Sequence, residues 1–376
     1  MGLKNRIVMF VLSILILFNS DSYSQLNSHI NGLVFADYYY YIENHDPSMR
    51  NQNAFQFRRI YLMFENNIKE NINIRFRLES AHPKFGQSGP LHPFVKHAYL
   101  GWSGLLPNHT LYIGIAETNA FSNTEEYWGY RSIEATIMDL NKICSSADMG
   151  IALKGNIGKT VHHWLTLYNG TGYKNSEQDQ YKKIGYAFWV TPVHGLILEG
   201  YFDYEKQDPN NAIDSATDYF GASSYRTVKA FLGYNNSVFT LGAEWFRRIN
   251  KQAGATDASG TLKTDVNKQG FSFFGSWVML IPKIKVFARY DQYEPNTKDG
   301  VWISDRANGT DDEFSYIFTG IDFMPEENIH FMPNIMIKRY ALDTKDADVT
   351  IRFTLYYQFD IVKIKNLEKI LYRISR

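Results

Sequence analysis

The sequence predicts an all-β fold, namely a transmembrane antiparallel β-barrel of about sixteen strands with the third long loop folded inward. Three observations lead to this prediction. Segments of roughly ten residues alternate apolar and polar side chains, and the connections between them alternate between short and long. After the N-terminus, no stretch has the run of about eighteen or more apolar residues that a membrane-spanning helix needs.

The alternation is clearest early in the chain. The even-numbered residues from Ile72 to Leu78 are apolar, whereas Arg75, Arg77 and Glu79 have the other parity. Because successive side chains of a strand point to opposite faces, this strand has one apolar and one charged face. In a soluble sandwich the apolar face would meet a core. In an outer-membrane barrel it would meet lipid, and the charged face would line a lumen.

Residues 1–24 are predicted to be a secretory signal peptide. A basic start and an apolar run over residues 7–18 precede small residues at a cleavage position before Gln25. The apolar run is too short to span a bilayer as a helix, and the alternative is an uncleaved anchor. We therefore expect an envelope protein whose barrel occupies residues 25–360.

The composition agrees with a barrel in the outer membrane of a bacterium. The formal net charge is zero, so nothing points to nucleic acid, and the chain holds 26 Tyr and 26 Phe, which suit the aromatic girdles of such barrels. The only cysteine is Cys144, so a disulfide framework is excluded, and we expect it to be a small loop residue without a redox role.

The candidate strands can be placed from the alternation, with boundaries uncertain by about two to four residues. They are expected near residues 29–42, 55–65, 70–81, 93–103, 109–116, 149–156, 161–168, 183–190, 195–204, 225–234, 237–248, 269–279, 284–291, 314–324, 329–340 and 348–360. In two of them, 93–103 and 225–234, the parity is ambiguous, because Lys96 and His97 in the first are neighbours of opposite parity.

The connections support one common orientation for all strands. Short turns are expected at residues 66–69, 104–108, 157–160, 191–194, 235–236, 280–283 and 325–328. Long polar connections include residues 43–54, 117–148, 205–224, 250–268 and 292–312. Strict alternation of short and long connections is typical of an outer-membrane barrel, which has short periplasmic turns and long extracellular loops. An even number of strands puts both termini on the periplasmic side.

Parity also predicts which charged residues line the pore. Arg or Lys facing lipid at the midplane costs about 2–4 kcal/mol, so charged residues between apolar ones should face inward. The predicted pore-lining residues are Arg59, Arg75, Arg77, Glu79, Glu199, Asp203, Arg289, Asp291 and Arg352.

A tail of residues 361–376 follows the last predicted strand. Its apolar residues recur at helical spacing, and it carries five basic residues against one acidic residue. One interpretation is a basic amphipathic helix on the periplasmic face of the membrane, and the other is a frayed, partly ordered tail.

The connection 117–148 is the longest, and we expect it to fold inward and narrow the pore. Its candidate constriction residues are Glu125, Glu126, Trp128, Arg131 and Glu134. Six acidic residues against two basic ones give it a net charge of −4. The aromatic group Tyr127–Tyr130 has two interpretations, either a platform on which sugars stack or a hydrophobic anchor that holds the loop against the barrel wall.

Several loose motifs, in order, resemble the phosphate-selective porin O and P family. They are Phe57–Leu62, Gly114, Phe121, Arg131-Ser132, Met149-Gly150, Tyr168–Tyr173 with Asp179, Lys182-Lys183 and Thr191-Pro192, and Ala288–Asp291 with Pro295. The similarity spans residues 30 to 360. It implies a sixteen-stranded general-diffusion or anion-preferring channel that is trimeric and has its third loop inside. The acidic loop departs from an anion-selective pattern, so phosphate specificity is not carried over.

The sequence shows no signature of an enzyme, a metal site or a cofactor site. His162 and His163 are neighbours on a strand, so they face opposite sides and cannot bind one metal together. The leading hypothesis is therefore a passive, weakly selective porin for small hydrophilic solutes or ions, embedded in outer-membrane lipid. The alternatives are a non-conducting surface-binding or structural barrel and, less favoured, a lipase-type barrel enzyme.

Overall fold

The computed structural model describes residues 28–82, 89–177, 179–206, 224–251, 266–298, 301–302, 313–341 and 345–364. The predicted signal peptide, residues 1–24, and most of the predicted tail lie outside these ranges. Within them no helix is both long enough and apolar enough to cross a membrane.

The described chain is almost entirely β-structure. The strands are β1 (Ser28–Glu43), β2 (Asn53–Lys69), β3 (Ile72–Ser80), β4 (Phe94–Ser103), β5 (His109–Glu117), β6 (Ala147–Ile157), β7 (Val161–Tyr168), β8 (Lys183–Val190), β9 (Leu196–Lys206), β10 (Ser224–Asn235), β11 (Phe239–Lys251), β12 (Val266–Val278), β13 (Ile284–Lys298), β14 (Val301–Trp302), β15 (Phe314–Glu326), β16 (Ile329–Tyr340) and β17 (Asp348–Ile364). The helical segments are η1 (Pro47–Met49), α2 (Ser122–Trp128) and α3 (Ile137–Leu140).

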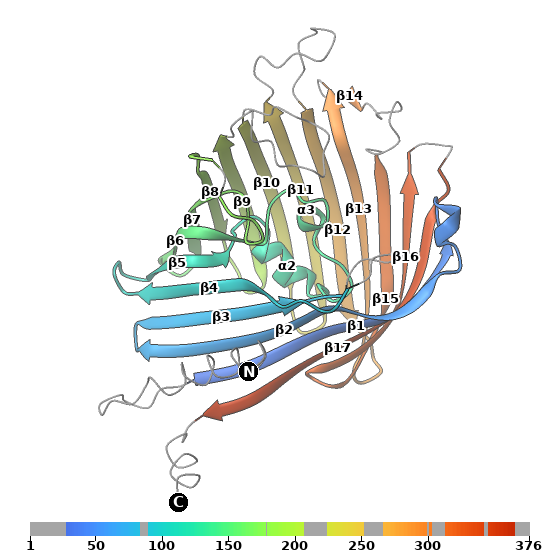
Figure 1. Cartoon of the computed structure of the whole chain (residues 1–376), viewed down its shortest axis with the longest axis horizontal. Helices are drawn as coiled ribbons and strands as arrows, with labels where there is room; N and C mark the ends of the chain where they lie inside the picture. Colours follow the sequence, from blue (N-terminus) through green and yellow to red (C-terminus); the bar gives the residue numbers. More distant parts are fainter. Residues whose placement is uncertain are drawn as a thin grey trace, which may run out of the picture.

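The strands form one closed antiparallel barrel (Figure 1). Each long strand pairs with its neighbours in sequence, and β1 closes the barrel by pairing with both β2 and β17. Apart from the two-residue β14, which pairs only with the end of β13, sixteen strands make the wall. The predicted fold and strand number are therefore confirmed.

The outer surface is an apolar belt. Side chains of one parity are exposed along most strands, as for Leu198 (45% exposed) and Phe353 (57%). Their strand neighbours Glu199 and Thr354 are buried. An exposed belt of this kind is stable when it faces hydrocarbon, because lipid removes the apolar surface from water.

The described short turns lie at one end of the barrel. The β2–β3, β4–β5 and β6–β7 turns are at the left in Figure 1, beside the ends of β1 and β17 that pair Ser28 with Ile364. The β8–β9 turn requires glycine, because Gly195 has a φ of +81° and a Cβ there would lie 1.9 Å from the carbonyl oxygen of Asn235.

Two strands extend farther than the sequence pattern predicts. β13 continues to Lys298 and pairs with Val301–Trp302, so the predicted connection 292–312 begins as an extended hairpin. β17 continues to Ile364 because β1 supplies hydrogen-bonding partners as far as Ser28. The first four residues of the predicted tail are therefore strand, and residues 365–376 lie outside the described residues.

Two β-bulges put adjacent charged residues on the same face. The β1–β2 register skips Arg58, and the β3–β4 register skips Lys96. A bulge places two residues opposite one on the partner strand, so strict alternation fails there. This explains the ambiguous parity of segment 93–103, since Lys96 and His97 are both buried inside the barrel.

The assignment of faces can be tested on β3. A spin label replacing Arg75 should be reached by a water-soluble quencher, because that position faces the interior. A label replacing Phe76, which is 41% exposed on the outer surface, should be reached by a lipid-soluble quencher. Electron paramagnetic resonance in lipid vesicles measures both. The reverse pattern would mean that the strand register is shifted by one residue.

Candidate channel constriction

The connection between β5 and β6 folds into the barrel, and we call residues 118–146 loop 3. It contains α2, which lies against β10 and β11, and α3, which lies against β12 (Figure 1). α2 ends at Gly129, whose φ of 66° and backbone N–H bond to the Glu125 carbonyl cap the helix and turn the chain. Loop 3 is therefore an ordered element inside the wall.

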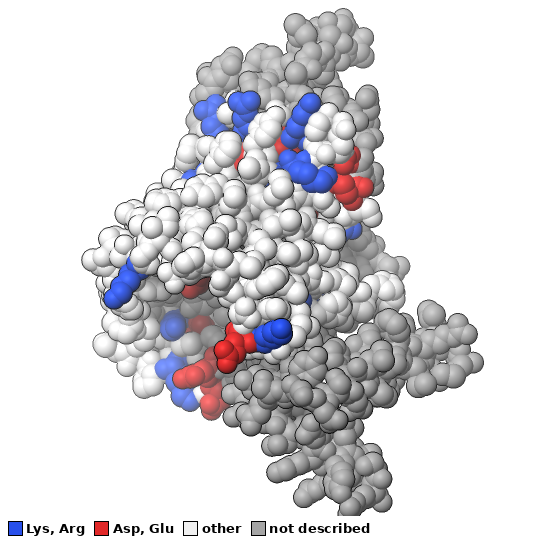
Figure 2. All heavy atoms as spheres, turned by 90° about the vertical axis from the view of Figure 1, so that its left-hand side faces the viewer, with Lys and Arg blue, Asp and Glu red and all other residues white. Residues whose placement is uncertain are grey.

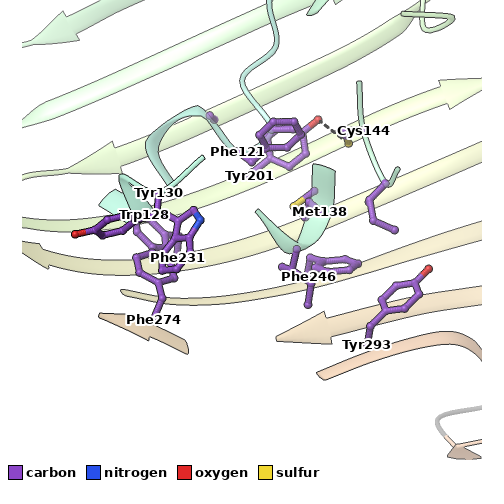
Figure 3. Close-up of a cluster of buried hydrophobic side chains, with 14 of the residues drawn as sticks. Phe121, Trp128, Tyr130, Met138, Cys144, Tyr201, Phe231, Phe246, Phe274 and Tyr293 are labelled. Carbon is purple, nitrogen blue, oxygen red and sulfur yellow. Dashed lines mark hydrogen bonds between the residues drawn. The ribbon is translucent and has the colours of Figure 1, made fainter. Parts of the chain in front are cut away.

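Apolar packing holds loop 3 against one side of the wall. Trp128 is 2% exposed and its ring lies edge-on to Phe274 and Phe287, while Tyr130 stacks on Phe287 at a centroid distance of 4.3 Å. Figure 3 shows Trp128 and Tyr130 gathered beside Phe274 and Phe231, with Met138 beside Phe246. The inner wall here is apolar, which suits burial under a loop and does not suit contact with water.

The packing decides between the two interpretations of the Tyr127–Tyr130 group. Trp128 and Tyr130 have their faces covered by wall residues, and the Trp128 Nε1–H donates to the Glu134 carbonyl at 2.9 Å. A sugar needs an exposed aromatic face for stacking. These two residues therefore act as the hydrophobic anchor of loop 3.

Three arginines of the wall fasten the middle of loop 3. Arg58 donates to the carbonyl groups of Ser132 and Ile133, Arg352 donates to Ile133 at 3.1 Å, and Arg289 donates to Ala135 at 2.6 Å. These cations satisfy backbone carbonyls that have no strand partner. The arginines come from β2, β13 and β17, so the loop is held by strands on both sides of β1, which closes the barrel.

α2 is fastened by a second polar group. The Asn123 amide donates to Glu199 at 2.8 Å, and the Lys229 ammonium donates to Thr124 Oγ1 at 3.1 Å. Lys229 also pairs with Glu199 at 2.8 Å. Both charges are buried, so each depends on the other for compensation.

Five predicted pore-lining residues lie at or near loop 3. Glu199, Asp203, Arg289, Asp291 and Arg352 point into the barrel, but they contact loop 3 or one another beneath it. Asp203 and Asp291 are fully buried, and Asp203 pairs with Lys183 at 2.9 Å. Sequence parity gives the face of a strand but not what covers that face. Their contacts are with loop 3 and with one another, and their assignment as pore lining stays a prediction.

On β2, β3 and the end of β5, three interior charged side chains are partly exposed. Arg75 pairs with Glu65 at 2.6 Å and with Glu117 at 3.4 Å, and these side chains are 26%, 34% and 42% exposed. Figure 2 shows the short-turn end of the barrel hollowed, with basic and acidic side chains together inside the hollow. A partly exposed group of mixed charge thus lies on these strands.

Glu79 on β3 contacts two further cations. It accepts from Arg59 at 2.8 Å and pairs with Lys96 at 3.0 Å. Arg77 lies over the Tyr61 ring at 5.3 Å. The carboxylate partners of Arg59 and Arg75 lie on strands β2, β3 and β5 rather than in loop 3.

The charges of loop 3 are largely compensated within the loop. Arg131 pairs with Glu125 at 2.8 Å and with Asp139 at 2.6 Å. Burial raises the pKa of Glu125, and the nearby Arg131 opposes this shift. Glu126 is exposed, and Glu134 accepts from the backbone N–H of Ala135 at 2.9 Å. Loop 3 itself holds four acidic and two basic residues, a net charge of −2, because Glu117 and Asp148 of the segment 117–148 lie outside it.

Several charged residues of this interior were missed by the sequence analysis, among them Arg58, Lys96 and Lys229. The first two sit in bulges, where parity gives the wrong face or no clear face. Lys229 lies in segment 225–234, whose parity was ambiguous in the sequence. In the structure this strand alternates regularly, and Thr227, Lys229 and Phe231 are all buried. A bulge is defined by how two strands pair, so the sequence of one strand alone does not reveal it.

Cys144 lies in loop 3 and is buried, with its Sγ 3.3 Å from Asp203 Oδ2. Burial raises the pKa of this thiol to about 12, although Lys183 opposes the shift, so the thiol stays protonated at neutral pH. Among the described residues, no group of three or more His, Cys, Asp or Glu side chains is arranged to hold a metal ion.

Comparisons with known proteins show what this fold resembles. No protein-family model matches the chain, and no curated protein matches it. Solved structures do match. OmpF of Salmonella typhi, in complex with daunomycin, has a TM-score of 0.63 at 11% identity and covers 90% of this chain and 99% of its own. The outer membrane channel DcaP of Acinetobacter baumannii has a TM-score of 0.61 at 12% identity, covering 91% and 99%.

A third similar structure is an anion-selective porin from Comamonas acidovorans, with a TM-score of 0.60 at 12% identity, covering 89% of this chain and 100% of its own. Identity this low shows the fold alone. That fold is the outer-membrane porin barrel, and together with the apolar outer belt it supports a location in the bacterial outer membrane.

The anchoring of loop 3 predicts the behaviour of Trp128→Ala. Removing a buried tryptophan costs about 3–5 kcal/mol of packing, and here the loss falls on the loop rather than on the barrel wall. We expect faster trypsin cleavage within loop 3, at Arg131 or Lys142, and a larger, fluctuating conductance in planar bilayers. Trp277→Ala, at an outer position that is 55% exposed, is the matched control. Equal cleavage rates in the two variants would argue against the anchor.

Proposed function

We propose that the protein is a passive porin that lets small hydrophilic solutes or ions cross the outer membrane with weak selectivity. The observation that supports this most directly is the partly exposed group of Arg75, Glu65 and Glu117 in an interior whose loop 3 is anchored to the wall. Sixteen strands enclose an aqueous channel in porins, and a loop held at one side narrows such a channel without filling it. The solute's own gradient would drive transport.

The pattern of ion pairs supports weak selectivity. Pores that strongly prefer one sign of ion carry rings of fixed like charge. Here Arg59, Arg75 and Lys96 have carboxylate partners within 3.4 Å, and Arg131 of loop 3 has two. We propose Arg59, Arg75, Arg77 and Glu79 as the pore lining, with Glu125, Glu126 and Glu134 across the constriction. Such a field favours neutral or weakly charged cargo.

This proposal also includes the family to which the protein belongs and its assembly as a trimer. Membership of the phosphate-selective porin O and P family rests on the motif order in the sequence, and a trimer rests on that resemblance. One of the similar structures, OmpT of Vibrio cholerae, was obtained in a trimer form. The competing function is a non-conducting barrel that binds partners through its long loops. Conductance separates the two, because only a porin passes current.

Removing acidic groups from loop 3 tests the selectivity. Replacing Glu125, Glu126 and Glu134 with Gln removes three negative charges and should shift the reversal potential toward anions. Acidification should do the same, because the raised pKa of Glu125 makes this carboxyl protonate at a higher pH than an ordinary glutamate. The measurement is the reversal potential across a salt gradient with purified protein in a planar bilayer.

The matched variant is Arg75→Gln, which removes a cation from β3 and should shift the reversal potential toward cations. A strong anion preference with tight phosphate block in the unmodified protein would contradict weak selectivity. A folded barrel that never conducts would contradict the porin itself.

A further inference from the structure

Two histidines that lie far apart in the sequence meet on the outer face of the barrel. The Nε2 atoms of His109 and His163 are 2.8 Å apart, and the ring centroids are 4.9 Å apart. His109 is the first residue of β5 and His163 the third of β7, so the pair lies at the short-turn end. The adjacent His162 faces the other side of β7, and its ring stacks on Trp189.

The strand between them makes this approach possible. Gly155 of β6 is paired with His109 on one side and with His163 on the other. A Cβ at Gly155 would lie 2.1 Å from His109 Cδ2 and 2.5 Å from its Nε2. Only a residue without a side chain lets the imidazoles lie over the middle strand and meet. The three positions therefore form one cross-strand row built around a glycine.

The ring of His109 is oriented as a metal ligand is. Its Nδ1 lies 2.6 Å from the Pro107 carbonyl oxygen, which can only accept, so Nδ1 carries the proton and Nε2 presents a lone pair toward His163. Histidines that bind metals commonly donate their second N–H to a backbone carbonyl in this way. Asn108, next to His109, is exposed at the short-turn end, where an ion can approach from water.

We propose that His109 and His163 form a binding site for a divalent transition-metal ion of the imidazole-preferring class. Two nitrogens at about 2.0–2.1 Å from a metal are about 2.9 Å apart when the angle at the metal is 90°. The 2.8 Å separation matches this spacing, which belongs to the square-planar or octahedral geometry of Cu²⁺ and Ni²⁺. Binding requires that His163 carries its proton on Nδ1, and water fills the remaining positions.

Ni²⁺ is the probe for the test, titrated by calorimetry into the untagged full-length mature protein in detergent at pH 7.5. We expect one saturable site per chain that weakens at least tenfold in His109→Ala and in His163→Ala. Gly155→Ala should weaken it similarly, although it removes no ligand, because its Cβ displaces the His109 ring. Lowering the pH to 5.5 should also weaken binding, since a protonated imidazole cannot bind a metal.

The matched control is His162→Gln, which changes the adjacent histidine on the opposite face and should leave Ni²⁺ affinity unchanged. Resistance of the folded barrel to unfolding in cold SDS gels confirms that each variant is folded. The proposal would be overturned if the unmodified protein showed no saturable Ni²⁺ binding, or if His109→Ala and His163→Ala bound Ni²⁺ as tightly as the unmodified protein. Either result would leave the pair as a neutral hydrogen bond between imidazoles. The outcome is independent of conductance.

Discussion

Every backbone N–H and C=O group that crosses the membrane must find a partner within the protein, because lipid offers none. The pairing of β1 with both β2 and β17 meets this requirement by removing the last free edges of the sheet. Closure then sets the other features. It fixes an inside and an outside, forces the apolar parity outward, and places the described short turns at one end.

Closure also creates an interior with an apolar and a charged part. On one side, inward-facing residues such as Phe231, Phe274 and Phe287 are apolar and are covered by Trp128 and other residues of loop 3. Elsewhere, Arg75 forms ion pairs with Glu65 and Glu117, and these three side chains are partly exposed. The loop thus buries the apolar part of the inner wall.

The arginines that fasten loop 3 show how local irregularity serves this arrangement. The bulge at Arg58 turns two consecutive arginines inward, one toward the loop carbonyls and one toward Glu79. The bulge at Lys96 brings a second cation to the same glutamate. Each bulge therefore adds a charged group to the interior without adding one to the lipid face, where it would cost about 2–4 kcal/mol at the midplane.

Local sequence patterns were enough to predict the barrel, its sixteen strands, the faces of β3, β9 and β13, and the inward folding of the third loop. These features follow from a period of two and from loop lengths, which are local properties of the chain. Only the tertiary structure decided that Arg289 and Asp291 lie beneath loop 3, that Arg58 and Lys96 sit in bulges, and that His163 meets His109. Each of these depends on strand register and on contacts between distant segments, which a local pattern does not specify.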